Sequence, residues 1–312
     1  MIPTAEVRPS KSARRWLKIK RNWMLYLFLV PSVAYIIIFN YLPLYGVQLA
    51  FKDYSAFQGI WGSAWAGFKH FTRFFESYQF WELIKNTLTL SLYQLIATFP
   101  TPIILAILIN YATSGKLRKF SQTVTYAPHL ISTVVMVGML MVFLQPQGLI
   151  NQIGQLFGLT PKLFLGDSKL FQSIYVWSEV WQQTGWSAII YIAVLTGGVS
   201  QELHEAAIVD GANKLQRIWH IDLVSLFPTA VILLIMNLGA VMNIGFEKDF
   251  LMQNDLNLNV SEIISTYVYK IGIQSAQYSF ATAIGLFNNI INFVLLIIVN
   301  RLARVLTDTS LW

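Results

Sequence analysis

One short polar stretch near the middle of the sequence combines acidic, small and turn-forming residues. It reads Glu205-Ala206-Ala207, and Asp210-Gly211 follows two positions later. A glutamate early in a short helix suits the positive end of the helix dipole. The small alanine side chains project little from the helix surface, and Asp-Gly is a strong turn signal. The stretch therefore predicts one of two things. It forms a helix–turn–helix elbow that docks in a groove of another protein, or it is a connector whose Asp-Gly only reverses the chain.

A second stretch mixes aromatic and polar side chains inside a long apolar run. Its members are Trp177, Glu179, Trp181, Gln182, Gln183 and Trp186. Carbohydrate offers hydroxyls that form hydrogen bonds and apolar ring faces that stack on aromatic side chains. These residues are therefore candidates for the wall of a sugar path. Two other interpretations stay open, namely packing between helices and an aromatic belt at the membrane surface.

Asparagines in two further apolar runs raise the same choice. Asn237 lies in one run, and the adjacent pair Asn288 and Asn289 lies in the other. Polar side chains in membrane helices often form hydrogen bonds to neighbouring helices, so helix packing is the simpler interpretation of any single one. Adjacent helix positions point about 100° apart, so Asn288 and Asn289 do not both face one partner well. We expect one of them to face a cavity or a second subunit, and we keep all three as candidates for the path.

The composition indicates that lipid is the main solvent of the elements that carry these residues. The chain has 312 residues, of which 55% are hydrophobic and 12% are charged, against about 25% charged in an ordinary soluble domain. It has no cysteine, which excludes disulfide bonds and iron–sulfur clusters. Its four histidines are scattered, so we expect no metal site.

Six apolar runs are long enough to span a membrane, which takes about 20 residues each. They cover about 23–45, 83–111, 123–145, 172–198, 221–244 and 280–300. We therefore predict an all-α membrane protein with six transmembrane helices in one domain, residues 23–306. A basic tail, residues 1–22, precedes this domain, a short tail, residues 307–312, follows it, and the polar loop covers about 200–222.

The distribution of positive charge predicts the orientation. The formal net charge is +7, and most of the 22 Lys and Arg residues fall in the N-terminal tail, in alternate loops and at the C-terminal end. Such residues are enriched on the cytoplasmic side, so we expect both termini in the cytoplasm. The excess of basic residues thus reports the orientation in the membrane and does not indicate that the protein binds nucleic acid. The basic tail either only fixes this orientation or also lies on anionic membrane lipid as an amphipathic helix.

The sequence holds no energy source of its own. The nearest approach to a phosphate-binding loop, Gly115-Lys116, lacks the required preceding glycine and the following Ser or Thr. We therefore expect no cofactor on this chain and no enzymatic activity, and any ATP is bound by another chain. Ionisable residues within membrane segments mark ion pathways, so an ion-coupled sugar carrier that uses Glu179 remains an alternative. A membrane enzyme would need an acid–base or metal cluster, and the sequence shows none.

The polar stretch also carries a family resemblance. The pattern is Glu205-Ala206-Ala207-x-x-Asp210-Gly211-Ala212, followed by Ile221-x-Leu223. It resembles the EAA loop of type I ABC importer permeases, which have the MetI-like fold. The resemblance implies a coupling helix that docks on an ATP-binding subunit. In this helix Glu205 pairs with a basic group of that subunit, Gly211 marks the turn, and Ala206, Ala207 and Asp210 are neighbouring contacts. The family usually has proline directly after Ile-x-Leu, whereas this chain has Val224 there and a proline at Pro228.

The resemblance extends along most of the chain. Tyr41-Leu-Pro43-Leu-Tyr45-Gly46 and Phe51-Lys52-Asp53-Tyr54 look like the polysaccharide-type branch named after LplB. Members of that branch are associated with oligosaccharides and with alginate or pectic fragments. The resemblance implies a multi-pass protein of the bacterial plasma membrane, paired with a second, related permease as a heterodimer. It also implies two ATP-binding subunits that hold ATP and Mg, and an extracytoplasmic solute-binding protein that delivers the saccharide.

Overall fold

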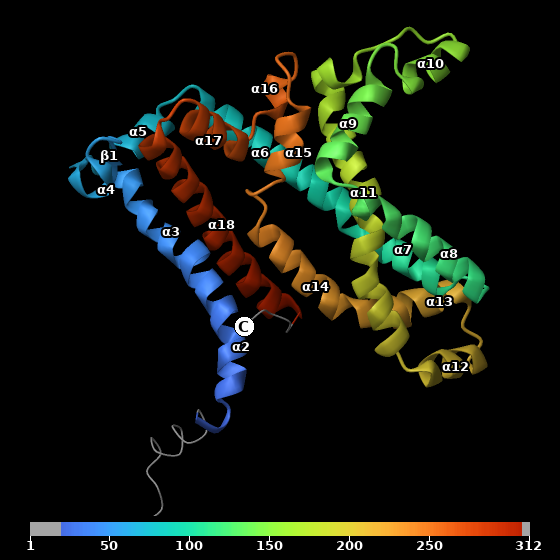
Figure 1. The fold of residues 1–312 in the computed structure, drawn as a ribbon. Helices are drawn as coiled ribbons and strands as arrows, with labels where there is room; N and C mark the ends of the chain where they lie inside the picture. The colour runs from blue at the N-terminus through green and yellow to red at the C-terminus, as the bar shows by residue number, and fades with distance from the viewer. Residues whose placement is uncertain (1–19, 308–312) are drawn as a thin grey trace, which may run out of the picture.

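The computed structural model describes residues 20–307, and most of them are helical (Figure 1). Among these residues the only sheet is a small antiparallel pair, β1 (Lys52–Asp53) and β2 (Ala64–Trp65). Lys52 pairs with Trp65 in its register. The predicted all-α class is confirmed. Most of the basic tail, residues 1–19, and residues 308–312 of the C-terminal tail lie outside the described residues.

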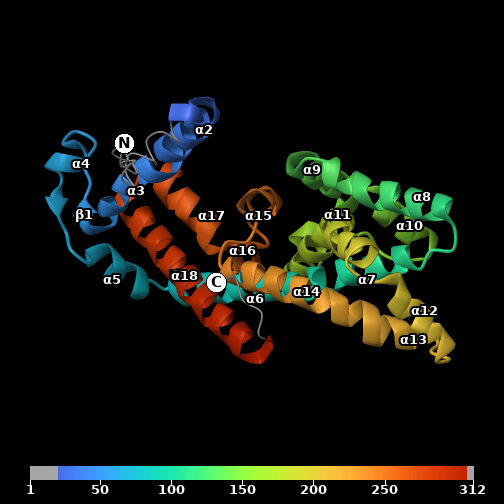
Figure 2. The same ribbon diagram turned by 90° about the horizontal axis from the view of Figure 1, so that it is seen from below.

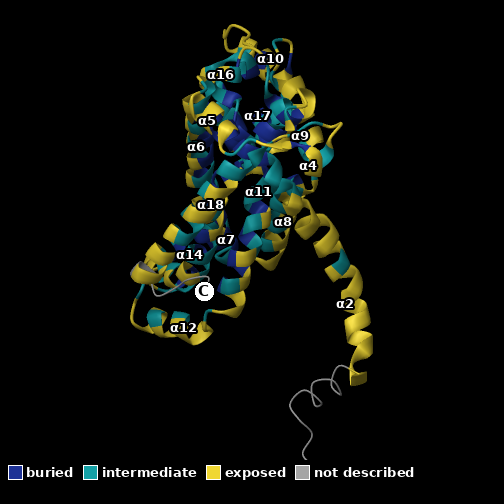
Figure 3. Ribbon diagram, turned by 90° about the vertical axis from the view of Figure 1, so that its left-hand side faces the viewer, coloured by how far each residue is buried: buried dark blue, intermediate teal, exposed yellow. Residues whose placement is uncertain are grey.

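The first apolar run forms a long, slightly irregular helix. Its parts are α2 (Trp23–Ile36), η1 (Ile37–Tyr41), α3 (Leu42–Leu44) and η2 (Tyr45–Phe51). Only its end, η2, packs closely on the last helix of the chain. α2 has no buried residue and diverges from the other helices (Figure 3). Its apolar side chains are thus free to contact lipid or another subunit.

The second run is also continuous. Before it lie two short helices, α4 (Gly59–Gly62) and α5 (Lys69–Phe75), and the run itself consists of α6 (Gln79–Thr98) and α7 (Pro100–Asn110). Pro100 and Pro102 fall in the first turn of α7. Proline is tolerated there because the N–H it lacks has no partner within that turn. The two helices therefore continue as one segment, Gln79–Asn110.

The third run, predicted as a single span, is interrupted. Its elements are α8 (Gly115–Tyr126), η3 (Ala127–Leu130), α9 (Thr133–Leu144) and α10 (Leu149–Leu156). The backbone becomes extended at Ile131 and Ser132. Pro128 in η3 has no N–H to donate, and the Ser132 hydroxyl accepts a hydrogen bond from Val135 N at 3.4 Å. This cap starts a new helix, so the run divides at Ser132.

The fourth run forms the central helix, α11 (Ser168–Gly197), after a short turn, η4 (Phe164–Gly166). α11 packs on α6, α7, α8, η3 and the later helix α14. Gly185 allows the closest of these approaches, because a Cβ atom there would collide with the backbone carbonyl of Thr125 in α8. α11 therefore positions its side chains against both halves of the described chain.

The polar stretch and the fifth run follow α11. They form α12 (Gln201–Val209), α13 (Lys214–Arg217), η5 (Ile218–Asp222) and α14 (Leu223–Gly239). Pro228 lies inside α14 without ending it. The remaining elements are α15 (Phe246–Met252), α16 (Leu258–Ser261), α17 (Ile264–Tyr269), η6 (Lys270–Gln274) and α18 (Tyr278–Thr307).

Within the described residues, five helical segments are long and apolar enough to cross a membrane, judged by length and composition. They are Trp23–Phe51, Gln79–Asn110, Thr133–Leu156, Lys214–Gly239 and Tyr278–Val305. The fourth predicted span falls on α11, which is long enough but carries the polar side chains described above. The start of α2, the α7–α8 turn and α12–α13 lie towards one end of the molecule, whereas α4, α10 and α16 lie towards the other (Figure 1). The loops thus alternate between the two ends of the molecule. Seen from below, α2, α5 and α18 lie on one side of the molecule and α7, α8 and α9 on the other (Figure 2).

Candidate functional site

The polar stretch forms the predicted helix–turn–helix elbow. α12 is capped by Ser200, the residue before it, whose side chain accepts a hydrogen bond from Glu202 N at 3.2 Å. It ends at Val209, and Gly211, two residues later, has a φ of 81° in the left-handed region that favours glycine. Ala212 N donates to Ala207 O at 2.8 Å and closes the turn. α13 then starts with a capping box between Asn213 and Gln216. The local sequence thus fixes both limbs of the elbow.

The outer surface of the elbow is accessible. Glu205, Ala206, Asp210 and Gly211 are exposed and Ala207 is half-buried. The Glu205 carboxylate accepts a hydrogen bond from Gln201 Nε2 at 2.9 Å within the same helix. α12 stands clear of the long helices at one end of the molecule (Figure 3). An exposed carboxylate beside small residues on a projecting helix suits docking to a basic groove.

The inner side of the elbow contains a small hollow of about 310 Å³ between its two limbs. Ala207, Asp210 and Gly211 line it on one side, and Arg217 and His220 line it on the other. Three of the five residues predicted to contact another subunit therefore also shape this hollow.

A second site is a cavity of about 550 Å³ beside α11. Three of the residues predicted for the path, Glu179, Gln183 and Trp186, line it from α11. Asn237 lines it from α14. The structure thus brings together four of the nine candidate residues. Gln94 and Thr98 of α6 and Ser187 and Tyr191 of α11 add to the polar lining, and sequence analysis did not identify them.

A smaller cavity of about 180 Å³ adjoins this one. The two cavities share Gln94, Thr98 and Asn237, and the smaller one reaches Asn243 and Gly245. Hydrogen-bonding side chains therefore continue beyond the cavity beside α11, to Ser91 in α6 and to Asn243 after α14. Such a lining suits a ligand that is rich in hydroxyl groups.

His129 of η3 organises the aromatic wall of the larger cavity. Its ring stacks on the Trp186 ring with centroids 4.4 Å apart and an interplanar angle of 10°. Its Nδ1 lies 2.8 Å from Gln183 Oε1, at hydrogen-bond distance. The Trp186 ring and the Gln183 amide are thereby held in place. His129 is far from α11 in the sequence, so spacing along α11 gives no signal for it.

Glu179 is held by a lysine from the segment after α14. Lys248 Nζ lies 2.9 Å from Glu179 Oε2 and donates a second hydrogen bond to Tyr175 O at 2.8 Å. Burial lowers the pKa of Lys248, and the Glu179 carboxylate opposes that shift. Glu179 is thus one half of an ion pair.

The other candidate residues of α11 lie outside this cavity. Trp177 donates from Nε1 to Tyr93 OH at 3.1 Å. Trp181 is about half exposed and does not line the cavity. Gln182 is buried, and its Nε2 donates to Ile131 O at 2.7 Å, at the break between η3 and α9. Gln182 thus satisfies the backbone where the third run is interrupted.

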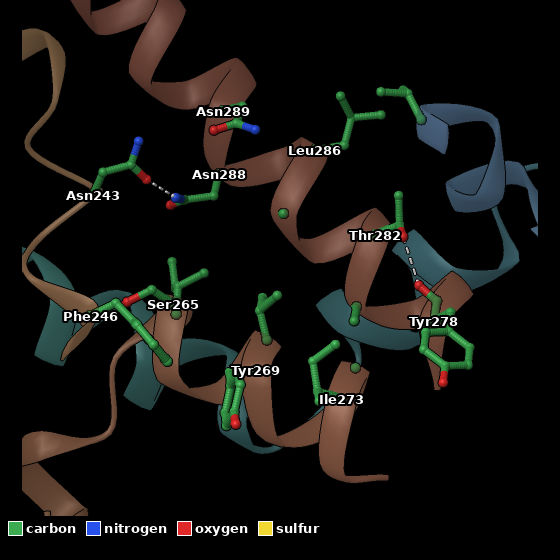
Figure 4. A pocket seen from close by; sticks show the side chains of 16 residues that line it. Asn243, Phe246, Ser265, Tyr269, Ile273, Tyr278, Thr282, Leu286, Asn288 and Asn289 are labelled. Atoms are coloured by element: carbon green, nitrogen blue, oxygen red, sulfur yellow. Dashed lines mark hydrogen bonds between the residues drawn. The ribbon is translucent and has the colours of Figure 1, made fainter. Parts of the chain in front are cut away.

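The adjacent asparagines of α18 differ in burial and in their contacts, and Figure 4 shows that Asn288 points towards Asn243. Asn288 is buried and donates from Nδ2 to Asn243 Oδ1 at 2.7 Å. Asn289 is exposed. Both line a separate cavity of about 600 Å³ between α17, η6 and α18. Most of that lining is apolar, with residues such as Val268, Ile273 and Leu286. This cavity is therefore less suited to a sugar than the one beside α11.

Comparison with known proteins places the chain in a family. Residues 84–308 match the family described as binding-protein-dependent transport system inner membrane component. Protein LplB of Bacillus subtilis (strain 168) is 41% identical over 289 residues, which cover 92% of this chain and 90% of that protein. The polygalacturonan/rhamnogalacturonan transport system permease protein YteP of the same organism is 40% identical over 298 residues. That alignment covers 95% of this chain and 92% of YteP.

A solved structure has the same fold. It is a chain from the crystal structure of a bacterial alginate ABC transporter in complex with an alginate pentasaccharide-bound periplasmic protein. The match has a TM-score of 0.87 and 39% sequence identity, and it covers 96% of this chain and all of that one. The predicted resemblance to ABC importer permeases is thereby confirmed. The chain belongs to the family of inner membrane components of binding-protein-dependent transport systems.

Proposed function

We propose that this chain is the transmembrane permease subunit of an ATP-driven importer for oligosaccharides or polysaccharides, such as alginate or pectic fragments. The observation that carries the coupling role is the exposed elbow of α12 and Gly211, which stands clear of the long helices. The polar and aromatic cavity beside α11 supports a saccharide. So do the relatives, which include a polygalacturonan/rhamnogalacturonan permease and an alginate transporter.

The assembly would contain four further kinds of component. They are a second, related permease, two ATP-binding subunits that hold ATP and Mg, an extracytoplasmic solute-binding protein, and the surrounding lipid. The periplasmic protein bound to the related alginate transporter supports the solute-binding partner. α11 would be the fourth of six spans, with both termini in the cytoplasm. Glu179 and Gln183 would then face the path, where they avoid contact with lipid.

Within this assembly, ATP binding would close the ATPase dimer and displace α12. Nucleotide drives such a switch only through its different affinities for the inward- and outward-facing states. Glu205 would supply the charged contact, and Ala206 and Ala207 would allow close approach. Saccharide would pass along the cavity that Gln183, Trp186 and Asn237 line.

Co-purification with the ATPase subunit tests this proposal. Glu205→Lys reverses an exposed charge on α12, and Glu247→Lys makes the same change in α15 near the opposite end of the molecule. We expect wild type and Glu247→Lys to retain the ATPase and Glu205→Lys to lose it, with all three folded in detergent. Equal retention by all three would contradict docking through α12, and the elbow would then be only a connector.

A further inference from the structure

α12 touches the remainder of the described chain at very few points. No residue of this helix is buried. His204 and Ala207 are its only half-buried residues, and Ala207 lines the hollow inside the elbow itself. The His204 side chain is 20% exposed. Among the long side chains of α12, His204 is therefore the one most covered by the helices beside it.

The partner of His204 is a fully buried carboxylate. His204 Nε2 lies 3.2 Å from Asp222 Oδ1, at ion-pair distance but without the alignment of a hydrogen bond. Asp222 is 0% exposed and is the last residue of η5, a π-helical turn directly before α14. Such turns are rare and often mark functional positions.

The second carboxylate oxygen of Asp222 binds a third element. Tyr111, the residue after α7, donates from its hydroxyl to Asp222 Oδ2 at 2.7 Å. Burial, followed by the hydrogen bond and the charge of Asp222, raises the pKa of Tyr111 to about 12, and Arg217 opposes this shift. The phenol therefore stays protonated at neutral pH and remains a donor. One carboxylate thus joins α12, the end of α7 and the start of α14.

A buried carboxylate of this kind is costly unless its contacts are made. A hydrophobic residue at position 222 would anchor α14 without that cost, but it would not hold His204. The side chains of His204 and Asp222 are short and cannot follow a large movement of α12. A displacement of α12 therefore either breaks their contact or moves Asp222. These properties suit a joint between a moving helix and the helices that it moves.

We propose that Asp222 is a positioning residue that ties α12, through His204, to the ends of α7 and α14. Displacement of α12 is then transmitted to the second and fifth spans through this carboxylate. This inference rests on the proposed function, because the displacement comes from the docked ATPase. If Asp222 were only a satisfied core residue, removal of His204 would change neither the order of α12 nor transport.

Hydrogen exchange of the full chain in lipid nanodiscs, without the ATPase, tests this joint, that is, the His204–Asp222 contact that ties α12 to α7 and α14. His204→Gln removes the imidazole, and Asp222→Asn removes the charge. The control His70→Gln removes an imidazole of α5 whose Nε2 lies at the same distance, 3.2 Å, from a carboxylate oxygen of Asp53. We expect the amides of Glu205–Val209 to exchange roughly tenfold faster in the first two variants, the size expected for loss of one charge-assisted contact. The control should match wild type, and the α14 amides should be unchanged in His204→Gln.

The double variant separates a joint from two independent effects. If His204 acts through Asp222, the double variant exchanges at the rate of Asp222→Asn alone. Additive acceleration, or no acceleration in His204→Gln, would overturn the proposal. In the assembled transporter, we expect His204→Gln to retain the ATPase and its ATP hydrolysis but to move roughly fivefold less saccharide per ATP, an effect in the usual range of coupling between sites. Loss of the ATPase from wild type would instead contradict the proposed function, and unchanged transport per ATP would contradict the joint.

Discussion

Lys248 and Glu179 form an ion pair, 2.9 Å between Nζ and Oε2, that links α15 to the middle of α11. The Lys248 side chain is 4% exposed and the Glu179 side chain 19%. Lys248 Nζ also lies 4.6 Å from the centre of the Tyr175 ring. The pair therefore anchors the segment after α14 beside the α11 cavity. This arrangement gives Glu179 a role that does not involve an ion gradient.

Glu179→Gln should destabilise the protein because it leaves Lys248 buried without a counter-charge. Removing one partner of a buried pair costs roughly 3–5 kcal/mol, whereas replacing both partners by apolar residues costs much less. We expect a clear fall in the apparent melting temperature in detergent for Glu179→Gln, and a smaller fall for Glu179→Gln combined with Lys248→Met. If Glu179→Gln is fully stable but abolishes uptake driven by a proton gradient, the ion-coupled interpretation is supported instead.

Trp186 and Trp181 of α11 are similarly exposed, so substitution of one serves as a control for substitution of the other. They are 51% and 52% exposed, but only Trp186 lines the cavity and stacks on His129. If saccharide passes through this cavity, Trp186→Ala removes a stacking surface worth about 1 kcal/mol. We therefore expect Trp186→Ala to reduce uptake by roughly fivefold, and Trp181→Ala to leave it near wild type. Uptake assays in proteoliposomes with equal amounts of assembled transporter provide the measurement, and equal uptake by both variants would contradict the path.

The burial of Asp249 predicts that the stability of the folded protein depends on pH. Asp249 is fully buried in α15, its Oδ2 accepts from Gln253 Nε2 at 2.8 Å, and Oδ1 has no partner. Burial raises the pKa of Asp249 to about 8; the Gln253 hydrogen bond and Lys270 oppose this shift, and Glu262 adds to it. The folded protein thus keeps a proton that the unfolded chain releases near pH 4. The stabilisation is complete below about pH 4 and is lost as the pH rises to about 8.

Thermal denaturation in detergent between pH 5 and pH 8 measures this effect. We expect the melting temperature of wild type to fall as the pH rises, because one such group contributes up to about 1.4 kcal/mol per pH unit. Asp249→Asn keeps an oxygen that accepts from Gln253 but cannot ionise, so its profile should be flatter. Parallel profiles for the two proteins would show that Asp249 is already ionised in the folded state.

The sequence could predict those parts of the site that depend on neighbours along the chain. Asp210-Gly211 indicated the turn after α12, and the apolar runs located the long helices. The break at Ser132 also had local signals, namely Pro128 and a capping serine, but continuous hydropathy across the run outweighed them. Local patterns thus sufficed for the elbow and for most helix positions.

The partners of the candidate residues could not be predicted in this way. Lys248 meets Glu179 across 69 positions, and His129 meets Gln183 across 54. Helical periodicity assigns a residue to a face, but it does not say which distant side chain that face meets. It also placed Gln182 with the path, whereas packing against Ile131 buries its amide. Tertiary contacts decided these cases, and one sequence contains no direct signal for them.

Gly211→Ala tests whether the shape of the elbow matters for docking. Gly211 has a φ of 81°, and a Cβ atom there would meet open space, so strain comes from the backbone alone. A left-handed conformation costs an L-residue about 1–2 kcal/mol. The alanine therefore favours continuation of α12 over the turn, which reorients Glu205 relative to α13.

Gly197→Ala at the end of α11 is the control, because its Cβ atom also meets open space and no left-handed conformation is required. We expect the ATPase to bind Gly211→Ala about 5–30-fold more weakly than wild type, and to bind Gly197→Ala as tightly as wild type. Both variants should keep the wild-type melting temperature, because α12 contributes no residue to the core. Equal ATPase affinity in titrations of the two variants would show that docking tolerates a distorted elbow.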